Sequence, residues 1–118
     1  MDRPEEIGGI SFETLFFQEI KAVNDNMKSG YGIYYWRTPN NFEVDFVLYG
    51  EKGIIAFEVK RTGKVNNKML KGLKVFIEQY PSAKAYFIYG GERKMSHGNI
   101  EILPIVDALK NLPKILTL

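Results

Sequence analysis

Residues 42–60 read FEVDFVLYGEKGIIAFEVK, two apolar and β-branched runs joined by a short turn with a glycine at each end. Such a pattern predicts a hairpin in which strands at residues 42–49 and 54–60 flank a turn at residues 50–53. A symmetric loop then places Asp45 opposite Glu58 and Glu43 opposite Lys60. The hairpin is therefore expected to bring ionisable groups together across two neighbouring strands.

The two faces of this hairpin are expected to differ in character. Side chains alternate along a strand, so Asp45, Glu58 and Lys60 should share one face. Directly opposed carboxylates lie about 5 Å apart at Cβ and repel unless a proton or a cation lies between them. Mg²⁺ suits such a pair, whereas salt-bridged surface residues are the competing interpretation. The opposite face should carry the apolar residues Phe42, Val44, Phe46, Leu48, Ile55, Phe57 and Val59.

Helices and further strands are expected on both sides of the hairpin. Apolar spacing predicts a helix over residues 12–27 capped by Ser11, a second over 66–80 ended by Pro81, and a third starting within 104–112. Strands are expected at 33–38, 85–89 and 100–103, with residues 92–98 around His97 as a loop. The order α-β-β-β-α-β-β-α predicts an α/β or α+β fold with one mixed sheet flanked by helices.

Length and composition limit the kinds of protein this chain can be. With 118 residues and 45% hydrophobic residues, we expect a flexible lead-in over residues 1–10 and one domain over 11–118. The absence of cysteine excludes disulfides, zinc fingers, iron–sulfur clusters and thiol catalysis. No signal peptide and no membrane-spanning apolar run are apparent, which favours a cytoplasmic protein without membrane contact. A net charge of +2 does not by itself indicate nucleic-acid binding.

A known group shares this arrangement of residues. Asp45, followed after twelve residues by Glu58-Val59-Lys60 and preceded by a helix bearing Phe12-Glu13, resembles the PD-(D/E)XK nuclease superfamily, which includes the archaeal-type Holliday junction resolvases. Val44 stands where that pattern has proline. A longer set resembles the uncharacterised carboxy-terminal domain of prokaryotic AAA-type ATPases: Gly9-Ile10-Ser11-Phe12-Glu13, Trp36-Arg37-Thr38, Glu43-Val44-Asp45-Phe46, Phe57-Glu58-Val59-Lys60 and Leu103-Pro104.

The resemblance implies a restriction-endonuclease-like core and a site for Mg²⁺, with Mn²⁺ as its substitute. Asp45, Glu58 and the backbone carbonyl of Val59 would be the ligands, and Lys60 would orient or help deprotonate the attacking water. Glu13 would be the fourth member, in the metal's second shell or at a second metal. Glu19 falls within the same apolar arc of the helix, so the helical wheel alone leaves the choice open, and a glutamate at a helix start is also stabilised by the helix dipole.

Basic residues follow the proposed site without interruption by an acidic one. DNA phosphates and the ordinary solvated face of an amphipathic helix explain this run equally well. Arg37 is a further candidate for phosphate contact, whereas the neighbouring Trp36 is expected in the core. The basic candidates after the hairpin are Lys60, Arg61, Lys64, Lys68, Lys71 and Lys74.

These observations lead to two functional hypotheses. The first is a Mg²⁺-dependent endonuclease domain that hydrolyses phosphodiester bonds in duplex or branched DNA. The second is a catalytically silent nuclease-like module that binds nucleic acid or protein while attached to an AAA-type ATPase. The resemblance implies a homodimer, as in the resolvases, and an ATPase portion outside this chain, because the sequence has no phosphate-binding loop of the G-x-x-x-x-G-K-[ST] type.

Overall fold

A mixed six-stranded sheet forms the centre of the protein. The computed structural model describes residues 6–7 and 10–117. The strand order is β3-β4-β5-β6-β8-β7, with β3, β4 and β5 antiparallel, β5, β6 and β8 parallel, and β7 antiparallel to β8. The expected mixed sheet is confirmed. Its strands are β3 (Gly32–Arg37), β4 (Glu43–Gly50), β5 (Gly53–Val59), β6 (Lys84–Tyr89), β7 (Met95–His97) and β8 (Ile100–Pro104).

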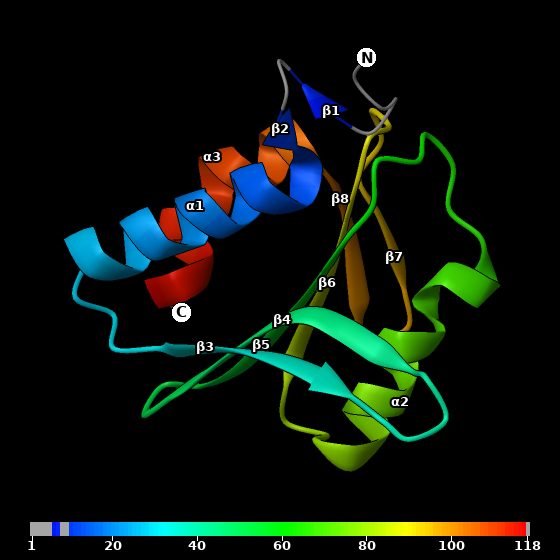
Figure 1. Cartoon of the computed structure of the whole chain (residues 1–118), viewed down its shortest axis with the longest axis horizontal. Coiled ribbons are helices and arrows are strands. Elements are labelled where there is room, and N and C mark those ends of the chain that lie inside the picture. Colours follow the sequence, from blue (N-terminus) through cyan, green and yellow to red (C-terminus); the bar gives the residue numbers. More distant parts are fainter. Residues whose placement is uncertain (1–5, 8–9, 118) are drawn as a thin grey trace.

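Helices cover both faces of this sheet (Figure 1). On one face, α1 (Phe12–Asn26) and α3 (Ile105–Thr117) share a buried cluster with β4 and β5. On the other face, η1 (Asn67–Leu70) and α2 (Lys71–Gln79) pack on a second cluster. The chain thus has two core layers, one on each side of the sheet, and the segment between β5 and β6 contains η1 and α2.

Local signals explain where α1 and η1 begin. The Ser11 side chain accepts a hydrogen bond of 3.1 Å from the Thr14 amide, which caps α1 as expected. The Asn66 side chain accepts from Met69 N at 3.0 Å and caps η1 in the same way. The helix expected over 66–80 is therefore present, but its first turn is a 3-10 helix, and α2 proper starts at Lys71.

The structure differs from the sequence-based prediction in two places, at the expected loop over 92–98 and at Pro104. The expected loop over 92–98 contains β7, whose exposed side chains offer no apolar alternation by which to recognise a strand. Pro104 belongs to β8, and α3 continues through Pro113 because Ile115 and Leu116 beyond it are buried. Their burial, about 1.5–3 kcal/mol each, offsets the roughly 3 kcal/mol that an interior proline costs a helix.

The expected lead-in over residues 1–10 lies mostly outside the described residues. Within it, β1 (Glu6–Ile7) pairs antiparallel with β2 (Ile10–Ser11) next to the start of α1. In the part of the chain that the structure describes, no helix is both long and apolar enough to cross a membrane.

Candidate active site

The predicted hairpin register is confirmed along most of β4 and β5. Pairs run from Gly50↔Gly53 to Phe46↔Phe57, so the next positions in the same register are Asp45 and Glu58. Gly53 has φ +132, a backbone conformation that side-chain-bearing residues rarely adopt, and it permits the tight turn. The turn therefore brings the two carboxylates together, as the sequence predicts.

A β-bulge interrupts β4 at this point. Between the pairs Tyr34↔Val47 and Trp36↔Val44, β4 contains one more residue than β3, which places Asp45 in the bulge. The bulge also turns Val44 toward the α2 face, whereas Phe46 stays on the α1 face. The expectation that Val44 shares a face with Phe46 is wrong for this reason, while Leu48, Ile55, Phe57 and Val59 do lie with Phe46.

Where the backbone pairing of β4 with β5 stops, each of the two carboxylates accepts a hydrogen bond from the opposite strand. The Asp45 amide donates to Glu58 Oε1 at 3.0 Å, and the Val59 amide donates to Asp45 Oδ2 at 2.8 Å. Each acidic side chain thus accepts from the backbone of the opposite strand. The pair is locked to both strands, and its position is set by the sheet itself rather than by a loop.

Burial makes this pair electrostatically unusual. Glu58 is 6% exposed, and burial together with the Asp45 charge raises the pKa of its carboxyl to about 8. Burial also raises the pKa of Asp45, against the opposing effect of the hydrogen bond from the Val59 amide. Lys60 Nζ, 3.8 Å from Glu58 Oε2, opposes the rise only in part. Near neutral pH the pair therefore holds a proton that a cation could replace.

Glu13 lies within electrostatic reach of the same pair. It is in the first turn of α1, where burial, and then the Asp45 charge, raise the pKa of its carboxyl, while Lys60 lowers it. Glu13 and Lys60 also line one hollow together. Glu19 is six residues further along α1, about 9 Å at 1.5 Å per residue. The structure thus brings Glu13, and not Glu19, beside the carboxylate pair.

Most of the basic candidates surround a neighbouring hollow of about 910 Å³, here called the basic hollow. It opens between the end of β5 and the start of α2, and Glu43 and Glu58 also line it. Arg61 lies outside it, with its guanidinium 5.3 Å from the Phe12 ring centre, and Lys64 is exposed in the loop before η1. The cations lining the basic hollow are Arg37, Lys60, Lys68, Lys71 and Lys74.

Two neighbours of the site could not be assigned from sequence. The Tyr35 hydroxyl donates to Glu43 Oε2 at 2.7 Å, a contact that depends on the bulged pairing of β3 with β4. Gly72 lies against the backbone of Glu43, where a Cβ would collide with the carbonyl oxygen. The small residue at this position sets how closely α2 approaches β4. A glycine inside an amphipathic helix is the only sequence signal for this approach.

Few of the described side chains at this site could bind a metal ion. Among the described residues, no three or more histidine, cysteine, aspartate or glutamate side chains gather where a metal ion could be held. What the strands do present is the Asp45–Glu58 pair followed directly by Val59, whose backbone carbonyl is a ligand that the resemblance implies. Carboxylate and carbonyl oxygens are hard donors, and Mg²⁺ typically takes one or two carboxylates with waters and substrate phosphate. The pair therefore fits Mg²⁺ chemistry.

Two comparisons with known proteins bear on this chain. The model of a family described as "Domain of unknown function (DUF4143)" matches residues 8–108, a range that includes every residue of the site. A search of curated proteins gave no match.

Proposed function

The chain belongs to the DUF4143 family of domains of unknown function, and we propose that it is a metal-dependent nuclease domain that hydrolyses DNA phosphodiester bonds. The observation that carries this proposal is the pair formed by buried Glu58 and half-buried Asp45, which the backbone of two strands holds in place. Removing two neighbouring carboxylates from solvent costs stability, and groups with pKa values perturbed in this way cluster at functional sites. The resemblance to the PD-(D/E)XK superfamily supports the same conclusion.

Asp45, Glu58 and the Val59 carbonyl would hold Mg²⁺, with Mn²⁺ as a substitute. Both side chains already face one another across the hairpin, where burial, and then the Asp45 charge, raises the pKa of Glu58 to about 8. Bound Mg²⁺ would supply Lewis acidity toward a phosphate and lower the pKa of a water molecule. Glu13, whose carboxyl senses the Asp45 charge, would lie in the second shell or serve a second ion.

Lys60 supplies the positive charge beside the pair. Its ammonium lies 3.8 Å from Glu58 Oε2, and its side chain is exposed on the hollow that it shares with Glu13. From this position it would orient the attacking water and stabilise the negative charge that develops on the phosphoryl oxygens. A lysine whose ammonium group lies beside Glu58 while its side chain remains open to solvent suits this role.

The basic hollow would receive the DNA backbone. Lys68, Lys71 and Lys74 project from η1 and α2 toward the same opening as Arg37. Glu58 lines this opening too, so a phosphate held there would lie next to the carboxylate pair. This continuity favours phosphate contact over the alternative of an ordinary solvated helix face. Phosphate contacts of this kind fix the position of DNA without reading its sequence.

A cleavage assay tests the proposal. The purified chain is incubated with end-labelled four-way junction, duplex and single-stranded DNA in Mg²⁺, Mn²⁺ or EDTA. We expect cleavage of at least one substrate with either metal and none in EDTA. Asp45→Asn should abolish cleavage, whereas Glu51→Gln, which alters an exposed carboxylate in the turn of the same hairpin, should not.

The same assay separates the proposal from its main alternative. Salt-sensitive binding to DNA without cleavage of any substrate would contradict the nuclease proposal and favour a silent nucleic-acid-binding module attached to an AAA-type ATPase. Cleavage that persists in Asp45→Asn would place the chemistry elsewhere. Sedimentation of the native chain with and without DNA would show whether it works as the homodimer that the resemblance implies.

A further inference from the structure

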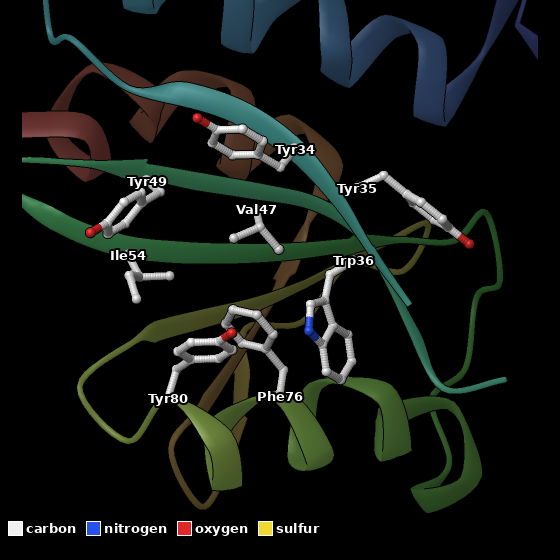
Figure 2. Close-up of a pocket in the computed structure, with 8 residues that line it drawn as sticks. All are labelled: Tyr34, Tyr35, Trp36, Val47, Tyr49, Ile54, Phe76 and Tyr80. Atoms are coloured by element: carbon white, nitrogen blue, oxygen red, sulfur yellow. The ribbon is translucent and has the colours of Figure 1, made fainter. Parts of the chain in front are cut away.

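An aromatic hollow of about 420 Å³ lies on the α2 face of the sheet, formed by β3, the adjoining ends of β4 and β5, and α2 (Figure 2). None of its eight lining residues is charged, and six are aromatic. Its aromatic residues are Tyr34, Tyr35, Trp36, Tyr49, Phe76 and Tyr80.

The floor of the hollow is more buried than its walls. Trp36 and Phe76 form the floor, with ring centres 5.1 Å apart in an edge-to-face contact. Three tyrosines in the walls are unusually open for such large rings: Tyr34 is 56%, Tyr49 58% and Tyr80 40% exposed. Flat aromatic surfaces are therefore available to a ligand without unpacking the core.

The position of the Tyr34 ring depends on a glycine. A Cβ at Gly32 would come within 2.6 Å of the Tyr34 hydroxyl oxygen, so the Tyr34 ring lies directly over Gly32 and would have to shift if this residue had a side chain. Gly32 pairs with Tyr49 on the neighbouring strand, which places the Tyr34 and Tyr49 rings on adjacent rows of one sheet face. The two exposed rings thus project from strands of the sheet rather than from a loop.

The aromatic hollow adjoins the basic hollow. Trp36 lines the aromatic hollow, and the next residue along β3, Arg37, lines the basic hollow. On α2, Phe76 lines the aromatic hollow and Lys74 lines the basic hollow. Tyr35 also lines the aromatic hollow, although its ring points away from Trp36 (Figure 2), and its hydroxyl donates to Oε2 of Glu43, which lines the basic hollow, at 2.7 Å. A ligand that carries negative charge beside a flat, uncharged ring would match this division.

We infer that the aromatic hollow binds an unpaired nucleobase of a DNA strand whose phosphates lie in the basic hollow. Proteins that bind single strands combine cations along the backbone with aromatic rings on which bases stack. An uncharged aromatic lining favours a base over a phosphate. This inference rests on the proposed function and narrows its substrate class to DNA with a single-stranded end, flap or branch, because bases inside an uninterrupted duplex are already stacked and paired.

Binding measurements in EDTA test the inference without requiring cleavage. Trp36 is the only tryptophan, so its fluorescence reports on the floor of the hollow directly. A short single-stranded oligonucleotide is compared with a strand of equal length and charge whose central residues are abasic. We expect the strand with bases to quench Trp36 and to bind about tenfold more tightly than the abasic strand.

Variants then test whether the preference for a strand with bases depends on the exposed tyrosines of the aromatic hollow. Tyr34→Ala combined with Tyr49→Ala should lower the affinity for the strand with bases to that for the abasic strand, and leave the latter unchanged. Tyr34→Phe, which keeps the ring, should bind as the native chain does. Val106→Ala, which truncates an exposed apolar side chain on α3, serves as the control. Since all three positions are more than half exposed, the fold should tolerate each change.

Three outcomes would overturn the inference: equal affinity for the two strands, no DNA binding at all, or a native dimer that Tyr34→Ala dissociates in sedimentation. The last would assign the hollow to a second copy of the chain. Each outcome is independent of metal binding and cleavage, which test the carboxylate pair separately. Conversely, a preference for bases in a chain that cleaves nothing would support the inference while contradicting the nuclease proposal.

Discussion

Replacing Glu58 with glutamine should make the metal-free protein more stable at alkaline pH. In the native fold the pKa of Glu58 rises from 4.5 to about 8, mainly because the side chain is buried and secondly because Asp45 is adjacent. The folded protein thus binds this proton more tightly than the unfolded chain does. The stabilisation from protonation is complete below pH 4.5 and is lost as the pH rises through about 8.

The size of this effect follows from the pKa values. A rise from 4.5 to about 8 corresponds, at about 1.36 kcal/mol per pH unit, to a loss on the order of 5 kcal/mol between acid and alkaline conditions. Burial raises the pKa of Asp45 as well, which acts in the same direction. Domains of this size have free energies of unfolding of only about 5–15 kcal/mol, so this loss would remove a large share of the protein's stability.

Glutamine removes the charge and keeps the contacts. Its Oε1 can still accept from the Asp45 amide, the bond that Glu58 accepts at 3.0 Å, and its amide can donate to the Asp45 carboxylate. We therefore expect Glu58→Gln to match native stability within about 1 kcal/mol at pH 5 and to exceed it by roughly 3–5 kcal/mol at pH 8.5. Mn²⁺ at pH 8.5 should stabilise the native chain but not this variant.

Urea denaturation at pH 5 and pH 8.5, in EDTA and in Mn²⁺, measures these free energies of unfolding. Glu51→Gln, at an exposed position in the turn of the same hairpin, is the matched control and should follow the native chain at both pH values. The reasoning is refuted if Glu58→Gln loses the same stability as the native chain between the two pH values. Such a result would mean that the carboxylates are not buried together.

Three further predictions concern the surroundings of the pair. Lys60→Ala should leave Mn²⁺ binding intact in a calorimetric titration but lower the rate of DNA cleavage by about 10²–10³; loss of metal binding would contradict this separation. Lys68→Glu combined with Lys71→Glu should weaken DNA binding and reduce the slope of log affinity against log salt by about 2, whereas Lys110→Glu combined with Lys114→Glu on α3 should not. Gly72→Ala should destabilise the fold by about 1–3 kcal/mol in urea denaturation because its Cβ would collide with the Glu43 carbonyl, whereas Gly63→Ala, which meets no atom within 4 Å, should be nearly neutral.

The features that sequence predicts well are local ones. The glycine-flanked turn determines the β4–β5 register, and this register places Asp45 opposite Glu58 before any long-range contact is known. Ser11 and Asn66 mark the starts of α1 and η1, because their side-chain oxygens accept hydrogen bonds from nearby backbone amides. Interactions within about twenty residues of chain are enough to define these elements.

The features that sequence misses depend on distant partners. The bulge at Asp45 arises from pairing with β3 and has no local signature. The sequence therefore could not predict which face of the sheet carries the Val44 side chain. Strand β7 forms only because β8 offers an unpaired edge. The exposure of Tyr34 and Tyr49 likewise depends on how much of the sheet α2 covers, which a strand pattern does not encode.

Calorimetric titration with Mn²⁺ at one pH tests most directly whether the Asp45–Glu58 pair is a metal site. It requires no choice of DNA substrate and compares the native chain with Asp45→Asn, Glu58→Gln and the control Glu51→Gln. We predict saturable binding by the native chain and by Glu51→Gln, and its loss in the two variants of the pair. Binding that survives in both of those variants, or no binding by a folded native chain at millimolar Mn²⁺, would contradict the assignment.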